Sequence, residues 1–189
     1  MKKWGGSPLR AAEVAPDAVI ATATLHPLEL MRQPDDLPLV YADMRRPLTT
    51  PPEFYTHTAA PEALASLYTD GPICVDIETD VPPTKIHIVA LSREPEQAHT
   101  VPFEGDYPAA LNRLLAGRRD IITQNGIGFD VPQLRRHGIA ISLDPRVTTV
   151  WDTMLMHHLV WPTLDHDLGT LGRQYTTKSY WKDWREAGD

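Results

Sequence analysis

The chain has 189 residues, a net charge of −7 at pH 7 and a single cysteine, Cys74. One cysteine excludes an intrachain disulfide framework and any zinc or iron–sulfur site built from several thiolates. No apolar stretch approaches the roughly 20 residues that span a bilayer. The amino terminus lacks the apolar core of a signal peptide, so we expect a cytoplasmic protein with no membrane contact.

The acidic excess is concentrated in one part of the chain. Residues 51–106 hold two Lys or Arg against ten Asp or Glu. The net charge of −7, taken alone, argues against a nucleic-acid partner. A site rich in carboxylates can nevertheless act on phosphates when divalent cations are bound there. A solvated acidic surface is the alternative.

The first fifty residues predict a small unit ahead of a proline-rich joint. Residues 18–27 predict a strand that runs into His26-Pro27, and a helix is expected near residues 39–45. Proline lacks an N–H group and disfavours helix in the residue before it. We therefore expect residues 47–61 to form an extended linker.

The remainder, residues 62–189, predicts one α/β domain. Three closely spaced strands precede an alternation of helix and strand, which indicates a mixed sheet flanked by helices. Cys74 is expected to be buried in the first of these strands. The expected strands are 73–78, 86–91, 99–103, 121–123 and 147–151, and the expected helices are 62–68, 107–115, 129–137, 153–160 and 168–175.

Two carboxylates stand close together on the first of these strands. Asp76 and Glu78 are two residues apart, so both side chains leave the same face of the strand while Ile77 points into the core. Adjacent anions repel each other, and this arrangement therefore favours a bound cation. The alternative is the solvent-facing edge of an amphipathic strand.

A third carboxylate follows at a change from strand to helix. Gly126 lets the backbone turn tightly, and Asp130 near the helix start gains from the helix dipole. We expect Phe129 to anchor the helix in the core and Asp130 to face outward. Alternatively, Asp130 is an N-terminal cap and Asn125 a turn residue.

Together these elements resemble the DEDD (DnaQ-like) superfamily of 3′-to-5′ exonucleases. The resemblance rests on Asp-x-Glu in a first strand and Asn-x-x-x-Phe-Asp about fifty residues later. The segment 122–134 looks especially like the proofreading domains of phage-type DNA polymerases, and segments 151–156 and 166–171 match the helices that follow there. The resemblance covers roughly residues 70–189. It implies a ribonuclease H-like fold.

The same resemblance implies residue roles and partners. The catalytic, metal-binding residues would be Asp76, Glu78 and Asp130. They would hold two Mg²⁺ or Mn²⁺ ions, the hard cations that oxygen ligands prefer. The substrate would be contacted by Thr79, Asn125 and Phe129. The implied partners are the 3′ end of single-stranded DNA and a polymerase domain or subunit, in a bacterial or phage-infected cell.

One family motif is missing from the sequence. The superfamily carries a fourth Asp in Tyr-x-x-x-Asp or His-x-x-x-x-Asp, and no tyrosine or histidine near the carboxyl end has an Asp at that spacing. We expect a chain truncated before that motif. A non-catalytic nucleic-acid-binding or interaction module with the same fold is the alternative. Asp152 is expected to cap the helix that follows it.

Two further resemblances are weaker. Residues 1–46 resemble the carboxyl end of a uracil-DNA glycosylase domain, in which His26 would match a histidine of the catalytic loop. We expect a remnant rather than a working glycosylase. A cluster of histidines followed by Asp167 allows an HD-type phosphohydrolase reading, which Pro162 disfavours by interrupting the helix.

Overall fold

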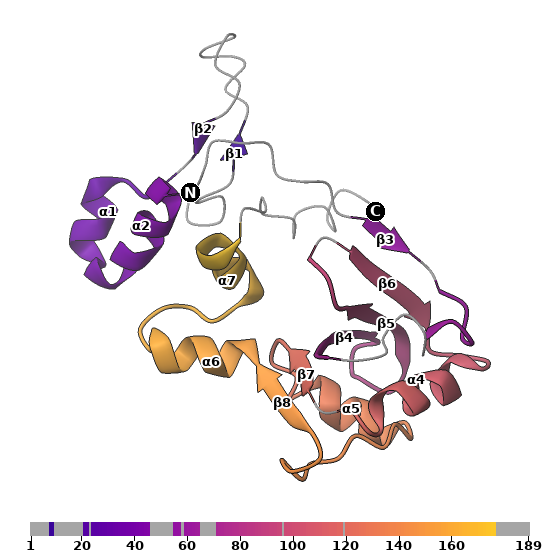
Figure 1. The fold of residues 1–189 in the computed structure, drawn as a ribbon. Coiled ribbons are helices and arrows are strands. Elements are labelled where there is room, and N and C mark those ends of the chain that lie inside the picture. Colours follow the sequence, from indigo (N-terminus) through magenta and orange to yellow (C-terminus); the bar gives the residue numbers. More distant parts are fainter. Residues whose placement is uncertain are drawn as a thin grey trace. The chain divides into compact units, whose positions relative to one another are not determined.

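The computed structural model divides the chain into two compact units, which are described separately. The first consists of residues 1–52 with 157–189, and the second of residues 53–156 (Figure 1). The structure describes residues 8–9, 21–22, 24–45, 55–57, 59–64, 71–95, 97–118 and 120–176.

The second unit contains a six-stranded mixed sheet in the order β3-β6-β5-β4-β7-β8. The pairs β4–β5 and β5–β6 are antiparallel, and the other three are parallel. The five expected strands are confirmed, and β3 was not expected from the sequence. The strands are β3 (Tyr55–His57), β4 (Ile73–Thr79), β5 (Ile86–Ser92), β6 (Gln97–Pro102), β7 (Asp120–Thr123) and β8 (Thr149–Asp152).

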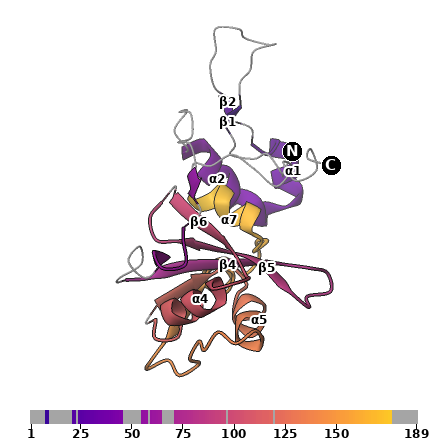
Figure 2. The ribbon, with the colours of Figure 1, turned by 90° about the vertical axis from the view of Figure 1, so that its right-hand side faces the viewer.

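The sheet buries one face under two helices, α4 (Tyr107–Leu115) and α5 (Asp130–Arg136) (Figure 2). Burial alternates strictly along β4 from Ile73 to Glu78, as the period of two in a half-covered strand requires. The core joins strand residues to the apolar sides of both helices: Val75, Ile77, Val89, Leu91, Ile121, Leu111, Leu115, Val131 and Leu134.

The short pairing of β4 with β7 leaves part of β4 available for other contacts. The register joins only Ile73 and Cys74 to β7, although β4 continues to Thr79. Strand β7 ends at Thr123, and the chain turns before α5 begins at Asp130. The start of α5 therefore lies beside the part of β4 that does not pair with β7.

The first unit combines both ends of the chain. It contains the short antiparallel pair β1 (Pro8–Leu9) and β2 (Ala21–Thr22), then α1 (Pro27–Arg32), the 3₁₀ turn η2 (Pro34–Asp36), α2 (Leu37–Arg45) and α7 (Leu168–Tyr175). Helix α6 (Thr153–Val160) runs from the second unit into the first.

Three expectations from the sequence agree with the structure only in part. Of the strand expected over residues 18–27, Ala21–Thr22 is a strand, residues 18–20 and 23 lie outside the described part of the chain, and Pro27 already begins α1. Of the helix expected over residues 62–68, residues 65–68 lie outside the described part of the chain. The proline-rich joint contains the first division between units, but the second division, after Met156, was not expected.

None of the helices in the described ranges is both long and apolar enough to cross a lipid bilayer.

A buried ion pair joins α2 to α7 inside the first unit. The guanidinium of Arg173 donates through Nε to Asp43 Oδ1 at 2.9 Å and through Nη2 to Oδ2 at 2.5 Å. Thr24 Oγ1 also donates to Asp43 Oδ2, at 2.7 Å. The side chains of Arg173 and Asp43 are only 7% and 1% exposed. A bidentate ion pair of this kind satisfies charges that would otherwise be costly to bury.

We predict that Asp43→Ala destabilises the first unit strongly. The substitution leaves the buried guanidinium of Arg173 without its carboxylate, at a cost of about 3–5 kcal/mol. The control is Glu29→Ala, which removes an exposed ion pair to Arg32 and should cost under about 1 kcal/mol. The free energy of unfolding from urea titrations tests both. Equal losses in the two variants would contradict a stabilising role for the buried pair.

Candidate functional site

Asp76 and Glu78 project from the exposed face of β4. Their neighbours Val75 and Ile77 are buried, so the alternation expected from the sequence is confirmed. Across the antiparallel pair, Asp76 lies opposite Ala90 on β5.

Asp130 meets β4 at its unpaired edge. The Asp130 carboxylate accepts a hydrogen bond from the backbone N–H of Ile77 at 3.0 Å. That N–H belongs to the residue between Asp76 and Glu78, so the Asp130 carboxylate lies at the stretch of β4 that carries the other two acidic residues. Asp130 is only 3% exposed. The expectation that Asp130 faces outward is therefore wrong, because the carboxylate replaces the missing β7 partner of β4.

Burial and a second negative charge act together on Asp130. Desolvation, followed by the charge of Asp76, raises the pKa of Asp130 to about 6, against the lowering effect of the Ile77 hydrogen bond. The charge of Asp152 contributes in the same direction. Asp130 is thus a carboxylate whose ionised form is costly in the metal-free chain.

The grouping and the chemistry of the carboxylates bear on whether they could hold a divalent ion. In the described ranges, no three His, Cys, Asp or Glu side chains are grouped so that they could hold a metal. Asp76 and Asp130 do influence each other electrostatically, and both offer only oxygen. By their chemistry, these two fit a hard divalent cation, whose charge would relieve their repulsion. The described residues therefore do not form a preorganised site for two ions.

The turn between β7 and α5 positions both Asn125 and Asp130. Asn125 has a φ of 60°, a left-handed conformation that asparagine tolerates better than most residues, so the turn role considered for it is confirmed. A Cβ on Gly126 would lie 2.3 Å from Thr123 Cβ, so only glycine fits there. The backbone N–H groups of Phe129 and Val131 donate to the carbonyls of Asn125 and Gly126, at 3.0 and 2.8 Å.

Asp152 has a second role that sequence reasoning missed. As expected, it caps α6, accepting from the N–H groups of Met154 and Leu155 at 3.0 and 3.4 Å. It also accepts from the N–H groups of Asn125 and Ile127, at 3.0 and 3.1 Å. The capping position was visible in the sequence, but no local signal connects residue 152 to residue 125.

The two other residues assigned to the substrate differ in exposure and surroundings. Thr79 ends β4 beside a bulge in the β4–β5 register, and its hydroxyl donates to the carbonyl of Asp80 at 3.0 Å. Phe129 immediately precedes α5 and is partly buried against the core, as its anchoring role required. Hydrogen bonds from the Thr84 hydroxyl and from the Lys85 and Thr84 amides hold the pKa of Asp80 well below its usual range.

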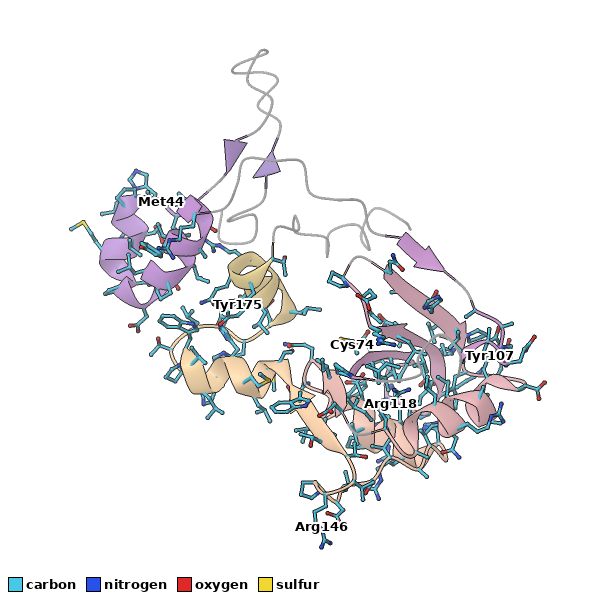
Figure 3. All side chains as sticks on the ribbon, viewed as in Figure 1. Met44, Cys74, Tyr107, Arg118, Arg146 and Tyr175 are labelled. Atoms are coloured by element: carbon cyan, nitrogen blue, oxygen red, sulfur yellow. The ribbon has the colours of Figure 1, made fainter. Side chains whose placement is uncertain are left out.

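Two sequence expectations concern His26 and Cys74. His26 is exposed and caps α1, with Nδ1 accepting from the N–H of Leu28 at 3.1 Å. Cys74 is exposed on β4, where Figure 3 labels it, so its expected burial is wrong. It shares a face with Asp76 because the two are separated by one inward-facing residue, Val75.

Three histidines of the first unit, His157, His158 and His166, contact one another. His166 contacts His157 through Nδ1 and His158 through Nε2, both at 2.8 Å, while His157 Nε2 contacts Gln174 Oε1 at 2.8 Å. Asp167 caps α7. These contacts occupy both nitrogens of the central ring. The interpretation of this cluster as the metal site of an HD-type phosphohydrolase is therefore not supported within the described residues.

We predict that Asp130→Asn stabilises the metal-free protein at neutral pH. The folded state favours the protonated carboxyl, so between about pH 4 and pH 6 it binds more protons than the unfolded chain. The free energy of unfolding should fall as pH rises through this window in the wild type. The variant should not share that fall, and above about pH 6 should gain up to about 2 kcal/mol.

The measurement is urea denaturation in chelator between pH 4 and pH 8. Asp106→Asn is the matched control, since it removes the same charge at an exposed position of the same unit. Parallel pH profiles for the wild type and Asp130→Asn would show that burial of this carboxylate carries no cost.

We predict that Gly126→Ala disrupts the turn. The added methyl would meet Thr123 at 2.3 Å, and the backbone must shift, costing roughly 1–3 kcal/mol of unfolding free energy. Gly117→Ala is the control, because a Cβ there meets nothing within 4 Å. Thermal and urea denaturation of both variants provide the test. A neutral Gly126→Ala would mean that the turn accommodates a side chain.

Comparison with known proteins yields structural similarities and no sequence family. No family model matches the chain, and no curated protein matches it. A solved structure described as the apo form of a nuclease is similar, with a TM-score of 0.53 and 22% identity over 75% of this chain and 67% of that chain. The chain therefore has the predicted α/β fold, a mixed sheet with helices that is consistent with the ribonuclease H-like nuclease fold.

Proposed function

We propose that the protein is a metal-dependent nuclease that removes nucleotides from the 3′ end of DNA. The observation that carries this proposal is the buried carboxylate of Asp130, held on the N–H of Ile77 between Asp76 and Glu78. The similarity of the fold to a structure described as a nuclease supports the same class of chemistry.

The cost of this arrangement suggests why it would exist. Asp130 could lower its energy by facing water, yet the chain buries it where the charge of Asp76 opposes its ionisation. Such perturbed groups gather at functional sites more often than elsewhere. A divalent cation would reverse the sign of the local electrostatics and favour the ionised form.

Each residue has a stated role in this proposal. Asp76 and Asp130 would hold one divalent ion, and Glu78 would join the exposed side of the site when a second ion and the substrate bind. Bound Mg²⁺ or Mn²⁺ ions would supply electrostatic stabilisation to the attacking and leaving oxygens of the phosphodiester. Thr79, Asn125 and Phe129 would orient the terminal nucleotide, since all three flank the carboxylates.

One observation favours a second candidate, a non-catalytic nucleic-acid-binding module with the same fold. Within the described residues there is no group of three metal-ligating side chains. Binding of single strands without hydrolysis would distinguish this candidate.

We also propose that residues 1–46 are a non-catalytic glycosylase-like remnant. His26 caps α1, a structural use of its ring, and Asp43 in α2 is committed to the ion pair with Arg173. Both contacts suit a segment retained for packing rather than for uracil excision.

We predict that Asp76→Ala and Asp130→Asn each abolish metal-dependent shortening of single-stranded DNA. Loss of a direct ligand should lower the rate at least about a hundredfold, more than the loss of an indirect contact. The assay is a time course with Mn²⁺ or Mg²⁺ on a 5′-labelled strand. Shortening of the strand by the wild type is expected only when the divalent ion is present.

Controls separate the competing explanations. Asp106→Asn removes an exposed charge from the same unit and should leave the rate unchanged. A strand with a blocked 3′ end, a circular strand and an RNA strand test polarity and substrate. Undiminished digestion by Asp76→Ala would remove that residue from the mechanism. Tight binding of single strands by a wild type that hydrolyses none of them would favour the non-catalytic module.

A further inference from the structure

Asp152 connects two elements of the second unit through four backbone N–H groups. Two of the donors, Met154 and Leu155, belong to the first turn of α6. The other two, Asn125 and Ile127, belong to the turn that precedes α5. The carboxylate is only 3% exposed. Charge-assisted bonds to four amides account for the burial of an ionised group.

Helix capping alone does not require this arrangement. An N-cap needs one side-chain oxygen that reaches the second or third amide of the helix, and serine serves as well as aspartate. Here Oδ1 accepts from the helix and from Asn125, whereas Oδ2 accepts from Ile127. The second oxygen and the length of the side chain are used for the turn rather than for the helix.

Backbone hydrogen bonds connect the turn held by Asp152 to the residues on either side of Asp130. The N–H of Phe129 donates to the carbonyl of Asn125, and the N–H of Val131 donates to the carbonyl of Gly126. Asp130 lies between these two donors in the chain. Its backbone is therefore fixed by Asn125, which Asp152 binds, and by Gly126, which lies between the two turn residues that Asp152 binds. The Asp130 side chain then reaches the N–H of Ile77 on β4.

We propose that Asp152 is a positioning residue, which holds the Asn125–Ile127 turn so that the Asp130 carboxylate stays on the N–H of Ile77. Its effect on the backbone does not depend on the proposed nuclease function. Its effect on metal affinity does rest on that function. Asp152 itself touches neither Asp130 nor β4 through any of its four hydrogen bonds.

Asp152→Ser separates the two roles. Serine can cap α6 but is too short to reach the amides of Asn125 and Ile127 at the same time. Asp152→Asn is the second variant, which keeps the length but has only one acceptor oxygen. Asp167→Ser is the matched control, because Asp167 caps α7 through the amides of Gly169 and Thr170.

The first readout is amide hydrogen exchange in the full chain without metal. In Asp152→Ser the Ile77 amide should exchange at least about tenfold faster, while amides of the β5–β6 ladder and the first turn of α6 keep their protection. Asp152→Asn should give a smaller increase, and Asp167→Ser none. Unchanged exchange at Ile77, or an equal acceleration across the whole sheet, would overturn the positioning role.

The second readout is Mn²⁺ binding, followed by electron paramagnetic resonance. Asp152→Ser should weaken the binding roughly 10–100-fold, the usual loss when a residue that orients a ligand is removed. If the wild type binds no Mn²⁺, the proposed metal site fails, while exchange at Ile77 still decides the role of Asp152. Unweakened Mn²⁺ binding by Asp152→Ser would overturn the proposed link to metal.

Discussion

The hydrogen bond from the Ile77 amide to Asp130 is the contact on which the site depends. Strand β7 pairs with β4 only through Ile73 and Cys74, so the next part of this edge needs another acceptor. Asp130, at the start of α5, supplies it from 53 residues further along the chain. One contact therefore supplies an acceptor at this strand edge, fixes the beginning of α5 and brings the Asp130 carboxylate to the stretch of β4 that carries Asp76 and Glu78.

Two buried carboxylates in this unit illustrate how surroundings decide the role of a side chain. Asp152 accepts hydrogen bonds from four backbone amides, and its charge is well satisfied. Asp130 accepts from Ile77 and is opposed by the charge of Asp76. The first arrangement suits a fixed structural contact. The second leaves a repulsion between two negative charges, which a bound cation could relieve.

The first unit depends on a different long-range contact. Asp43 and Arg173 are 130 residues apart, yet their buried pair joins α2 to α7. Helix α7 thus shares a unit with the amino-terminal segment rather than with the large sheet. Asp43, which belongs to the segment that the sequence presents as an appendage, therefore supplies one of the two partners of this ion pair.

Local pattern in the sequence was sufficient to predict the secondary structure around the site. The period of two in β4 placed Asp76 and Glu78 on one face, and the change from strand to helix placed Asp130 at the start of α5. Sequence could not show that Asp130 is buried or that Asp152 reaches Asn125. Periodicity reports only neighbours along one element, whereas these contacts depend on where β7 stops pairing and how the turn folds back.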